Sequence, residues 1–213
     1  MPEKKKTYRV AIYDTETTWL YSAKQTDLSK QPYVVQFAGI LVDMDDEWNF
    51  VELRRINQLI KPPISIPPIT SEIHWIYDID VINKKSFSSY SELISKWISY
   101  PDVIVWHNIQ FDENVVRTEF KRLALEWTVI WYEPKRSICT MNESINYCKL
   151  PKKSAKAKWF KRPKLQELVK KTCWHYFRWW HDAIVDVEWT LKALSVLVKN
   201  KVVTLEDNSL TLF

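Results

Sequence analysis

Glycine is almost absent from this chain of 213 residues, in which Gly39 is the only one. An average composition would supply about 15 glycines over this length. Tryptophan is unusually frequent, with 12 residues. Many tight turns place a backbone φ angle in the positive range, where a residue with a Cβ atom is strained. The positions of the tryptophans therefore bear on how this chain makes its turns.

Long apolar runs and paired cysteines are also missing. The longest apolar run, 34–42, contains Gln36 and is far shorter than the roughly 20 residues of a membrane-spanning helix. Charged residues near the N-terminus are not followed by an apolar segment, so we expect no signal peptide. The spacing of the three cysteines indicates reduced thiols and neither a disulfide frame nor a zinc site. We expect a cytoplasmic protein that does not contact a membrane; the cysteines are Cys139, Cys148 and Cys173.

The residues that are present indicate a single α/β domain that spans 1–213. Hydrophobic residues make up 46% of the chain and charged residues 27%. This balance excludes a collagen-like chain, a coiled coil and a disordered tail. Lysine and arginine number 31 against 26 acidic residues, which gives a net charge of +5. Such a mildly basic chain can bind a polyanion, although its charge does not require one.

Hydrophobic periodicity predicts a mixed five-stranded sheet flanked by helices, with a core at 8–199. Alternating segments rich in β-branched residues indicate strands at 8–14, 34–43, 50–60, 103–105 and 135–139. Apolar residues at helical spacing indicate helices at 86–98, 111–125, 165–171 and 183–198. Prolines predict a loop with neither helix nor sheet at 62–68. We also expect a basic exposed loop at 149–164 and a short hairpin at 202–213.

Two carboxylates lie at the end of the first predicted strand. Side chains alternate along a strand, so Asp14 and Glu16 point to the same face. Neighbouring carboxylates repel each other unless a cation lies between them, and Mg²⁺ prefers oxygen ligands. A metal site is one interpretation of this pair, and a solvated strand end is the other.

Two further clusters favour the metal site. Asp112 follows shortly after the predicted strand 103–105, and His181 and Asp186 lie at the start of the last predicted helix. Positions five apart on a helix differ by about 140°, so these two side chains can flank one site. The clusters together supply four carboxylates and one histidine that titrates near neutral pH.

The chain resembles the DEDDh 3′–5′ exonucleases, the DnaQ-like family that includes the ε-subunit type of DNA polymerase III. Three motifs carry the resemblance and occur in the family's order: Asp-Thr-Glu-Thr-Thr at 14–18, His-Asn-Ile-Gln-Phe-Asp at 107–112 and His-Asp-Ala-Ile-Val-Asp at 181–186. The histidine of the third motif separates this branch from its tyrosine-containing relatives. The resemblance implies a ribonuclease H-like fold.

The resemblance also implies a two-metal hydrolysis of phosphodiesters. His181 is then the general base that takes a proton from the attacking water. Asp14 bridges both ions, which are Mg²⁺ with Mn²⁺ as a substitute. The implied metal ligands are Asp14, Glu16, Asp112 and Asp186.

Substrate contacts are implied after the first motif, where the family holds the 3′-terminal nucleotide, and in the second motif. For His107 a hydrogen-bonded structural role is the alternative. We expect no role in the site for His74 or His175. The implied substrate-binding residues are Thr15, Thr17, Thr18, Leu20, His107 and Asn108.

Five tryptophans occupy positions where glycine or another small residue is expected. Four of them replace small residues in or beside the family's motifs, and Trp174 follows a predicted helix where glycine is a common cap. Stacking of indoles on bases explains one or two tryptophans, but not the shortage of glycine. Our hypothesis is that most are glycines in the natural protein, because UGA codons that some bacteria read as glycine were translated as tryptophan. The five are Trp19, Trp75, Trp106, Trp174 and Trp180.

The resemblance favours DNA as the substrate, at single-stranded or frayed 3′ ends, in proofreading, repair or processing. An RNA-trimming exonuclease of the same fold is the alternative, since nothing in the sequence reports on the 2′-OH. A catalytically inactive nucleic-acid-binding module is a third interpretation. The presence of all five predicted catalytic residues argues against it. Only about 14 residues follow the last predicted helix, where the ε-subunit type has a C-terminal extension that holds its polymerase. This argues against a stable DNA polymerase subunit as partner, and a free-standing repair or processing exonuclease is an equal alternative.

Basic residues crowd the segment before the third motif. They predict phosphate contacts with the substrate strand, which would make binding salt-dependent, or a solvated loop. The residues are Lys152, Lys153, Lys156, Lys158, Lys161, Arg162 and Lys164.

Overall fold

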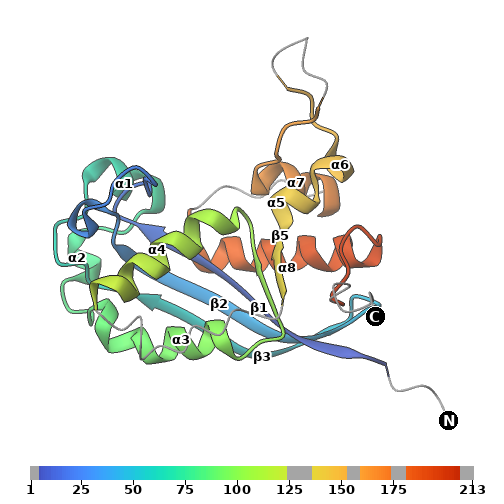
Figure 1. Ribbon diagram of the computed structural model, residues 1–213, viewed down its shortest axis with the longest axis horizontal. Helices are drawn as coiled ribbons and strands as arrows, with labels where there is room; N and C mark the ends of the chain where they lie inside the picture. The colour runs from blue at the N-terminus through green and yellow to red at the C-terminus, as the bar shows by residue number, and fades with distance from the viewer. Residues whose placement is uncertain (1–4, 124–135, 153–158, 174–180, 207–213) are drawn as a thin grey trace.

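A five-stranded sheet forms the centre of the computed structural model, which describes residues 5–123, 136–152, 159–173 and 181–206 (Figure 1). The strand order is β3-β2-β1-β4-β5. β2 runs antiparallel to β1 and to β3, whereas β4 runs parallel to β1 and to β5. This is the expected mixed sheet. The strands are β1 (Thr7–Thr17), β2 (Val34–Asp45), β3 (Phe50–Leu59), β4 (Val103–Trp106) and β5 (Arg136–Cys139).

Helices lie on both faces of the sheet. Helices α3 (Ser91–Ser99) and α4 (Ile109–Arg122) lie on one face, and α8 (Ala183–Lys199) lies on the other (Figure 1). Beyond β5 the chain forms a group of three short helices, α5 (Thr140–Glu143), α6 (Ile145–Cys148) and α7 (Leu165–Cys173). Within the described ranges, no helix is long and apolar enough to cross a bilayer.

The alternation of side chains along β1 divides the core into two layers. Val10 and Ile12 pack in the layer that contains α8, and Ala11 and Tyr13 pack in the layer that contains α3 and α4. The same alternation continues past the apolar residues. The carboxylates that end β1 therefore emerge on the α8 side of the sheet.

A helix begins at the last residue of the predicted loop 62–68. Pro68 is the first residue of α1 (Pro68–His74), a position where the missing N–H of proline costs nothing. α2 (Asp78–Val81) follows it, so the expected loop at 62–68 ends in a helix. The predicted hairpin at 202–213 falls mostly outside the described residues, and its described part, 202–206, contains no strand.

Candidate active site

Asp14 and Glu16 end β1 in a strongly acidic environment. Burial raises the pKa of the Asp14 carboxyl well above its usual range, and the negative charges of Asp112 and Asp186 add to this effect. Burial and the charge of Asp186 raise the pKa of Glu16 in the same way. Such shifts mean that several carboxylates share one poorly solvated space.

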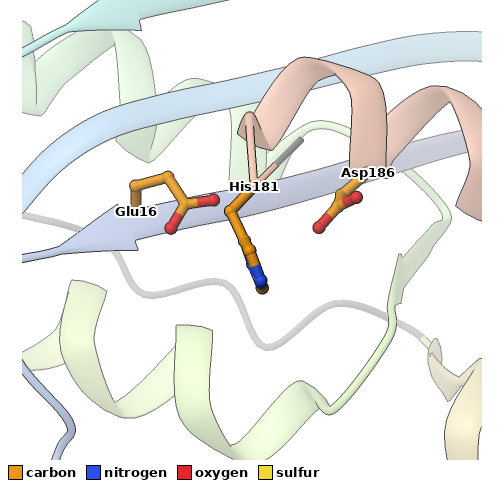
Figure 2. A group of neighbouring side chains, drawn as sticks. All are labelled: Glu16, His181 and Asp186. Carbon is orange, nitrogen blue, oxygen red and sulfur yellow. The ribbon is translucent and has the colours of Figure 1, made fainter. Parts of the chain in front are cut away.

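The start of α8 brings a histidine and a carboxylate to Glu16. The ligand atoms of Glu16, His181 and Asp186 all lie within 4.8 Å of one another. Figure 2 shows the imidazole of His181 between the two carboxylates. Burial lowers the pKa of His181, and the positive charge of Lys164 lowers it further. The imidazole is therefore biased toward the neutral form, which can accept a proton.

Asp112 enters the site from the first turn of α4. Its Oδ1 accepts hydrogen bonds from the backbone N–H of Thr15 at 3.0 Å and from the Thr15 hydroxyl at 2.7 Å. Burial raises the pKa of Asp112 to about 7 despite these two donors. The resemblance implied that Thr15 binds substrate; in this structure its hydroxyl donates to Asp112, and contact of Thr15 with substrate stays a prediction.

This set of side chains fits a divalent cation. Burial and the charges of Asp182 and Asp112 raise the pKa of Asp186 to about 7. One of its oxygens, Oδ1, is buried and has no hydrogen-bond partner among the residues that the structure describes. A hard cation with oxygen ligands would satisfy that oxygen and offset the repulsion among the carboxylates.

Two residues that connect α8 to the sheet were not among the predicted site residues. Asp182 is the N-cap of α8, and its Oδ1 accepts from the backbone N–H of Ile184 at 3.2 Å. Gln36 of β2 donates to Asp182 Oδ1 at 2.8 Å and accepts from the N–H of Ala183 at 3.2 Å. An aspartate directly before an apolar helix is a known N-cap signal, whereas no local pattern points to Gln36.

The threonines predicted to contact substrate are buried inside the protein. Thr17 donates its hydroxyl to the carbonyl of Trp19 at 2.8 Å. The Thr18 hydroxyl accepts from the backbone N–H of Tyr33 at 2.9 Å. Leu20 is different, because 79% of its surface is exposed. Asn108 is exposed at the start of α4, in the left-handed backbone region with φ 81°.

Both ring nitrogens of His107 lie within hydrogen-bond distance of other parts of the protein. Its Nδ1 is 3.0 Å from the Thr140 hydroxyl, and its Nε2 is 3.1 Å from the Pro163 carbonyl. Burial lowers its pKa to about 4. These contacts match the structural alternative for His107 and join the second motif to the residues before α7. Contact of His107 with substrate stays a prediction.

His74 lies closer to the site than expected. It is buried at the end of α1, and its Nδ1 accepts from the backbone N–H of Ile76 at 3.1 Å. A pocket of about 560 Å³ has both His74 and His181 in its wall. Burial lowers the pKa of His74 to about 4, and the charge of His181 acts in the same direction. His175 lies outside the described residues.

The backbone supports glycine at one of the five tryptophan positions. Trp75 follows α1 with φ 60° and ψ 21°, in the left-handed region. Trp48, which the sequence analysis did not single out, also has a positive φ of 67°. Trp19 and Trp106 are not among the described residues with positive φ. The remaining two, Trp174 and Trp180, lie outside the described residues.

A family model described as Exonuclease (RNase_T) matches residues 11–194. This chain belongs to the exonuclease family. The match contains every residue of the acidic cluster and the histidine beside it, and it places the chain among hydrolases that act on nucleic acid. The expected enzyme class is thereby confirmed. No curated protein matches the sequence.

Solved structures of exonucleases share the fold at low sequence identity. Exonuclease X in complex with 5′ overhanging duplex DNA is 21% identical with a TM-score of 0.56, over 90% of this chain and 92% of that chain. A zinc-bound complex of Escherichia coli Exonuclease I with single-stranded DNA is 19% identical with a TM-score of 0.67, over 93% and 41%. The chain thus spans about two fifths of Exonuclease I.

A third structure is the nuclease domain of 3′hExo, a DEDDh family member, bound to rAMP. It is 11% identical with a TM-score of 0.66, over 94% of this chain and 95% of that domain. These likenesses confirm the ribonuclease H-like exonuclease fold, with its mixed sheet between helices.

Proposed function

We propose that this chain is a single-domain, divalent-metal-dependent exonuclease that removes nucleotides from single-stranded or frayed 3′ ends of DNA. The observation that carries the proposal is the convergence of Glu16, His181 and Asp186 within 4.8 Å. Besides burial, the charge of Asp112 raises the pKa values of both carboxyls in this group, and the charges of Glu16 and Asp186 raise the pKa of Asp14. A neutral histidine beside a carboxylate cluster suits phosphodiester hydrolysis better than binding alone.

The carboxylates are the groups that would hold the metal. Asp14, Glu16, Asp112 and Asp186 offer hard oxygen ligands, which suit two Mg²⁺ ions or Mn²⁺. Divalent cations in such a site neutralise phosphate charge and make a coordinated water more acidic. The bridging role of Asp14 rests on the resemblance of the first motif.

His181 is the proposed general base. Its neutral imidazole takes a proton from water as the water oxygen forms a bond to phosphorus. The bond from phosphorus to the 3′-oxygen of the preceding nucleotide breaks, and that oxygen leaves with the shortened strand. Thr15 keeps Asp112 in place during this exchange through its two hydrogen bonds.

DNA is the favoured substrate, and RNA is the second candidate. Complexes of Exonuclease X and Exonuclease I with DNA support the first. The 3′-exonuclease that recognises the histone mRNA stem-loop supports the second, at 12% identity and a TM-score of 0.65. An ε-like proofreading role with a polymerase partner, or a free-standing repair or processing role, remains compatible with this site. The three cysteines are free, which suits a reducing cytoplasm.

A labelled-oligonucleotide assay tests the proposal. Single-stranded DNA and RNA of the same sequence, each labelled at the 5′ end, are incubated with the protein and Mg²⁺. We expect a ladder that shortens from the 3′ end, faster on DNA, and no ladder in EDTA. The Asp186→Asn variant serves as the inactive control. A protein that binds both strands equally with and without metal and cleaves neither with Mg²⁺ or Mn²⁺ is a binding module, and the proposal is then wrong.

A further inference from the structure

The loop between β1 and β2, residues 18–33, is closed at its base. The backbone N–H of Thr18 donates to the carbonyl of Tyr33 at 3.0 Å, and the N–H of Tyr33 donates to the Thr18 hydroxyl at 2.9 Å. Inside the loop, the Gln31 side chain donates to the carbonyls of Ser22 at 2.7 Å and Gln25 at 2.6 Å. A loop whose ends meet and whose interior is filled by its own side chains is a compact Ω-loop.

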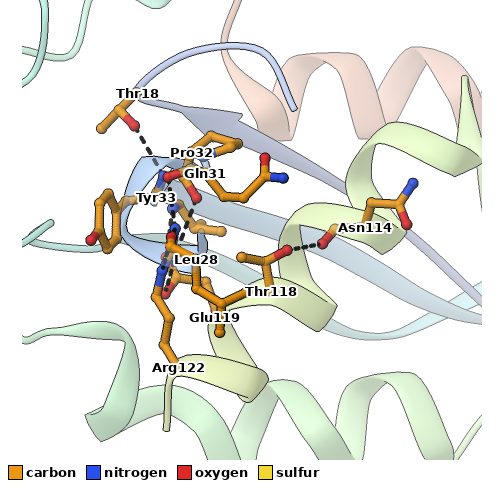
Figure 3. A network of polar contacts seen from close by, with 10 residues as sticks. Thr18, Leu28, Gln31, Pro32, Tyr33, Asn114, Thr118, Glu119 and Arg122 are labelled. Atoms are coloured by element: carbon orange, nitrogen blue, oxygen red, sulfur yellow. Dashed lines mark hydrogen bonds and ion pairs between the residues drawn. The ribbon is translucent and has the colours of Figure 1, made fainter. Parts of the chain in front are cut away.

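A single arginine from the last turn of α4 attaches this loop to the helix. The Arg122 guanidinium donates to the carbonyl of Leu28 at 2.7 and 3.1 Å, to that of Gln31 at 2.7 Å and to that of Pro32 at 3.0 Å. It also lies over the Tyr33 ring, 3.7 Å from the centroid. Figure 3 shows these contacts around the closed end of the loop.

Glu119 completes the attachment one turn earlier on α4. Its Oε2 is 3.1 Å from the Arg122 guanidinium, and its Oε1 accepts from the backbone N–H of Val34 at 2.9 Å. The side chains of Arg122 and Glu119 are only 13% and 6% exposed. Only a planar guanidinium has enough donors to bridge three carbonyls and a carboxylate at once, and a lysine does not.

The attached loop carries the exposed side chain nearest the end of β1. Leu20 follows Thr18 by two residues and is 79% exposed, so its side chain is accessible to a ligand. α4 also holds Asp112 in its first turn. One rigid helix therefore holds both a carboxylate of the site, at one end, and the loop with Leu20, at the other.

We propose that Arg122 is a positioning residue for substrate binding: it fixes loop 18–33 against α4 so that Leu20 meets the terminal nucleotide in register with the carboxylates. This inference rests on the proposed function. The contacts of Arg122 include none of the four site carboxylates and no reacting atom. We therefore expect it to affect binding of the strand end. Loss of such placement weakens substrate and transition state alike, which raises KM at constant kcat.

The test compares Arg122→Gln and Arg122→Lys with the matched control Arg117→Gln. Arg117 lies on the same helix and pairs with Glu113 at 2.7 Å, on the helix surface. Steady-state hydrolysis of the single-stranded oligonucleotide gives KM and kcat. We expect both Arg122 variants to raise KM about tenfold or more with kcat within about twofold, and the control to change neither.

A purely stabilising role predicts a different result. If Arg122 served only folding, the folded fraction would fall and kcat with it, at unchanged KM. That result, or equal KM values for Arg122→Lys and Arg117→Gln, overturns the inference. If Arg122→Gln fails to fold, Arg122→Lys carries the same test, because it keeps a positive charge beside Glu119.

Leu20→Ala supplies a second readout. If Arg122 acts through Leu20, its substitution raises KM much less in the Leu20→Ala background than in the native chain. Additive effects overturn the inference. Faster tryptic cleavage after the exposed Lys24 in the Arg122 variants would report the loosened loop directly. A wild-type protein with no nuclease activity would refute the proposed function instead, which keeps the two failures distinct.

Discussion

Individual carboxylates in this site are destabilising, and a cation would reverse that effect. The pKa values of Asp112 and Asp186 rise to about 7 because both groups are buried. Asp186 also keeps one buried oxygen that has no hydrogen-bond partner within the described part of the chain. A residue with this environment is better explained by function than by stability, since structural carboxylates are normally paired.

Asp186→Asn should separate activity from stability. We expect nuclease activity to fall at least about 100-fold, because even residues behind metal ligands cost 10–100-fold when removed. Without metal the variant should be more stable by about 1 kcal/mol, a rise in Tm of roughly 2–4 °C, because one repelling charge is gone. Glu188→Gln, on the solvent side of the same helix beside Arg55, is the control for both measurements.

Trp75→Gly tests the backbone part of the tryptophan hypothesis. Trp75 has a φ of 60° and is 60% exposed, so glycine would relieve strain and lose little packing. We expect a gain of about 1 kcal/mol in the free energy of unfolding, measured in denaturant. Trp19→Gly should give no gain in the free energy of unfolding, because Trp19 has no positive φ and its indole N–H donates to the backbone carbonyl of Lys30 at 3.2 Å.

The codons of the gene test the recoding hypothesis itself. UGG codons at the five tryptophan positions would contradict it.

At the scale of elements, the placement of His181 depends on how α8 is attached to β2. Gln36 lies directly opposite Glu16 in the β1–β2 ladder and also holds Asp182 and the N–H of Ala183. One side chain thus ties a strand to a helix 146 residues later. The distance between base and carboxylate is set by this contact and not by either element alone.

Gln36→Leu should therefore impair catalysis without unfolding the protein. Leucine keeps the volume but leaves the first N–H of α8 without its acceptor, which costs about 1–3 kcal/mol. We expect kcat to fall about tenfold or more, with a far-ultraviolet circular dichroism spectrum like that of the wild type. Gln58→Leu, on β3 in the wall of the same pocket, is the control. Equal kcat for both variants would show that Gln36 does not position α8.

At the scale of the whole molecule, the site makes stability depend on pH and metal. The carboxyls have higher pKa values in the folded than in the unfolded chain. The folded protein therefore binds more protons between pH about 4 and about 7, and its stability falls as the pH rises through that interval. This dependence has the opposite sign to that of ion-paired carboxylates.

In EDTA, Tm should drop by at least about 2 °C between about pH 5 and about pH 7.5, a loss of roughly 1 kcal/mol or more. Mg²⁺ should remove most of this drop, because it stabilises the charged form of the cluster. The double variant Asp112→Asn, Asp186→Asn should show a smaller drop, which comes from Asp14 and Glu16 and from groups outside the site. A wild-type Tm that changes neither with pH nor on addition of Mg²⁺ would contradict the metal-site assignment.

The basic segment before α7 should set the salt dependence of binding. Lys152, Arg162 and Lys164 are exposed, whereas the remaining lysines at 153–158 lie outside the described residues. Replacing these three by glutamine should reduce the slope of log K against log salt by up to about 2, at about 0.7 per phosphate contact on a single strand. Lys96, Lys192 and Lys199, away from the start of α8, supply the control triple. Identical slopes would identify the segment as a solvated loop.

Local sequence patterns were enough to predict the strands, the order of the motifs and the residue types proposed for the site. Alternation along β1 is local, so it predicted that Asp14 and Glu16 share a face. Helical spacing predicted α8, with Asp186 in its first turn and His181 just before its N-cap. Such patterns arise from backbone geometry over a few residues, and they need no knowledge of the rest of the chain.

The roles of Thr15 and Arg122 depend on contacts that form only in the folded chain. Thr15 holds Asp112 across 97 positions, and Arg122 holds Leu28 across 94. Their partners become neighbours only when the sheet and α4 have packed, so no local periodicity reports them. The apolar Leu20 is exposed, whereas the polar Thr18 two residues earlier is buried. The packing of the loop, and not the residue type, therefore decides which of these side chains contacts solvent.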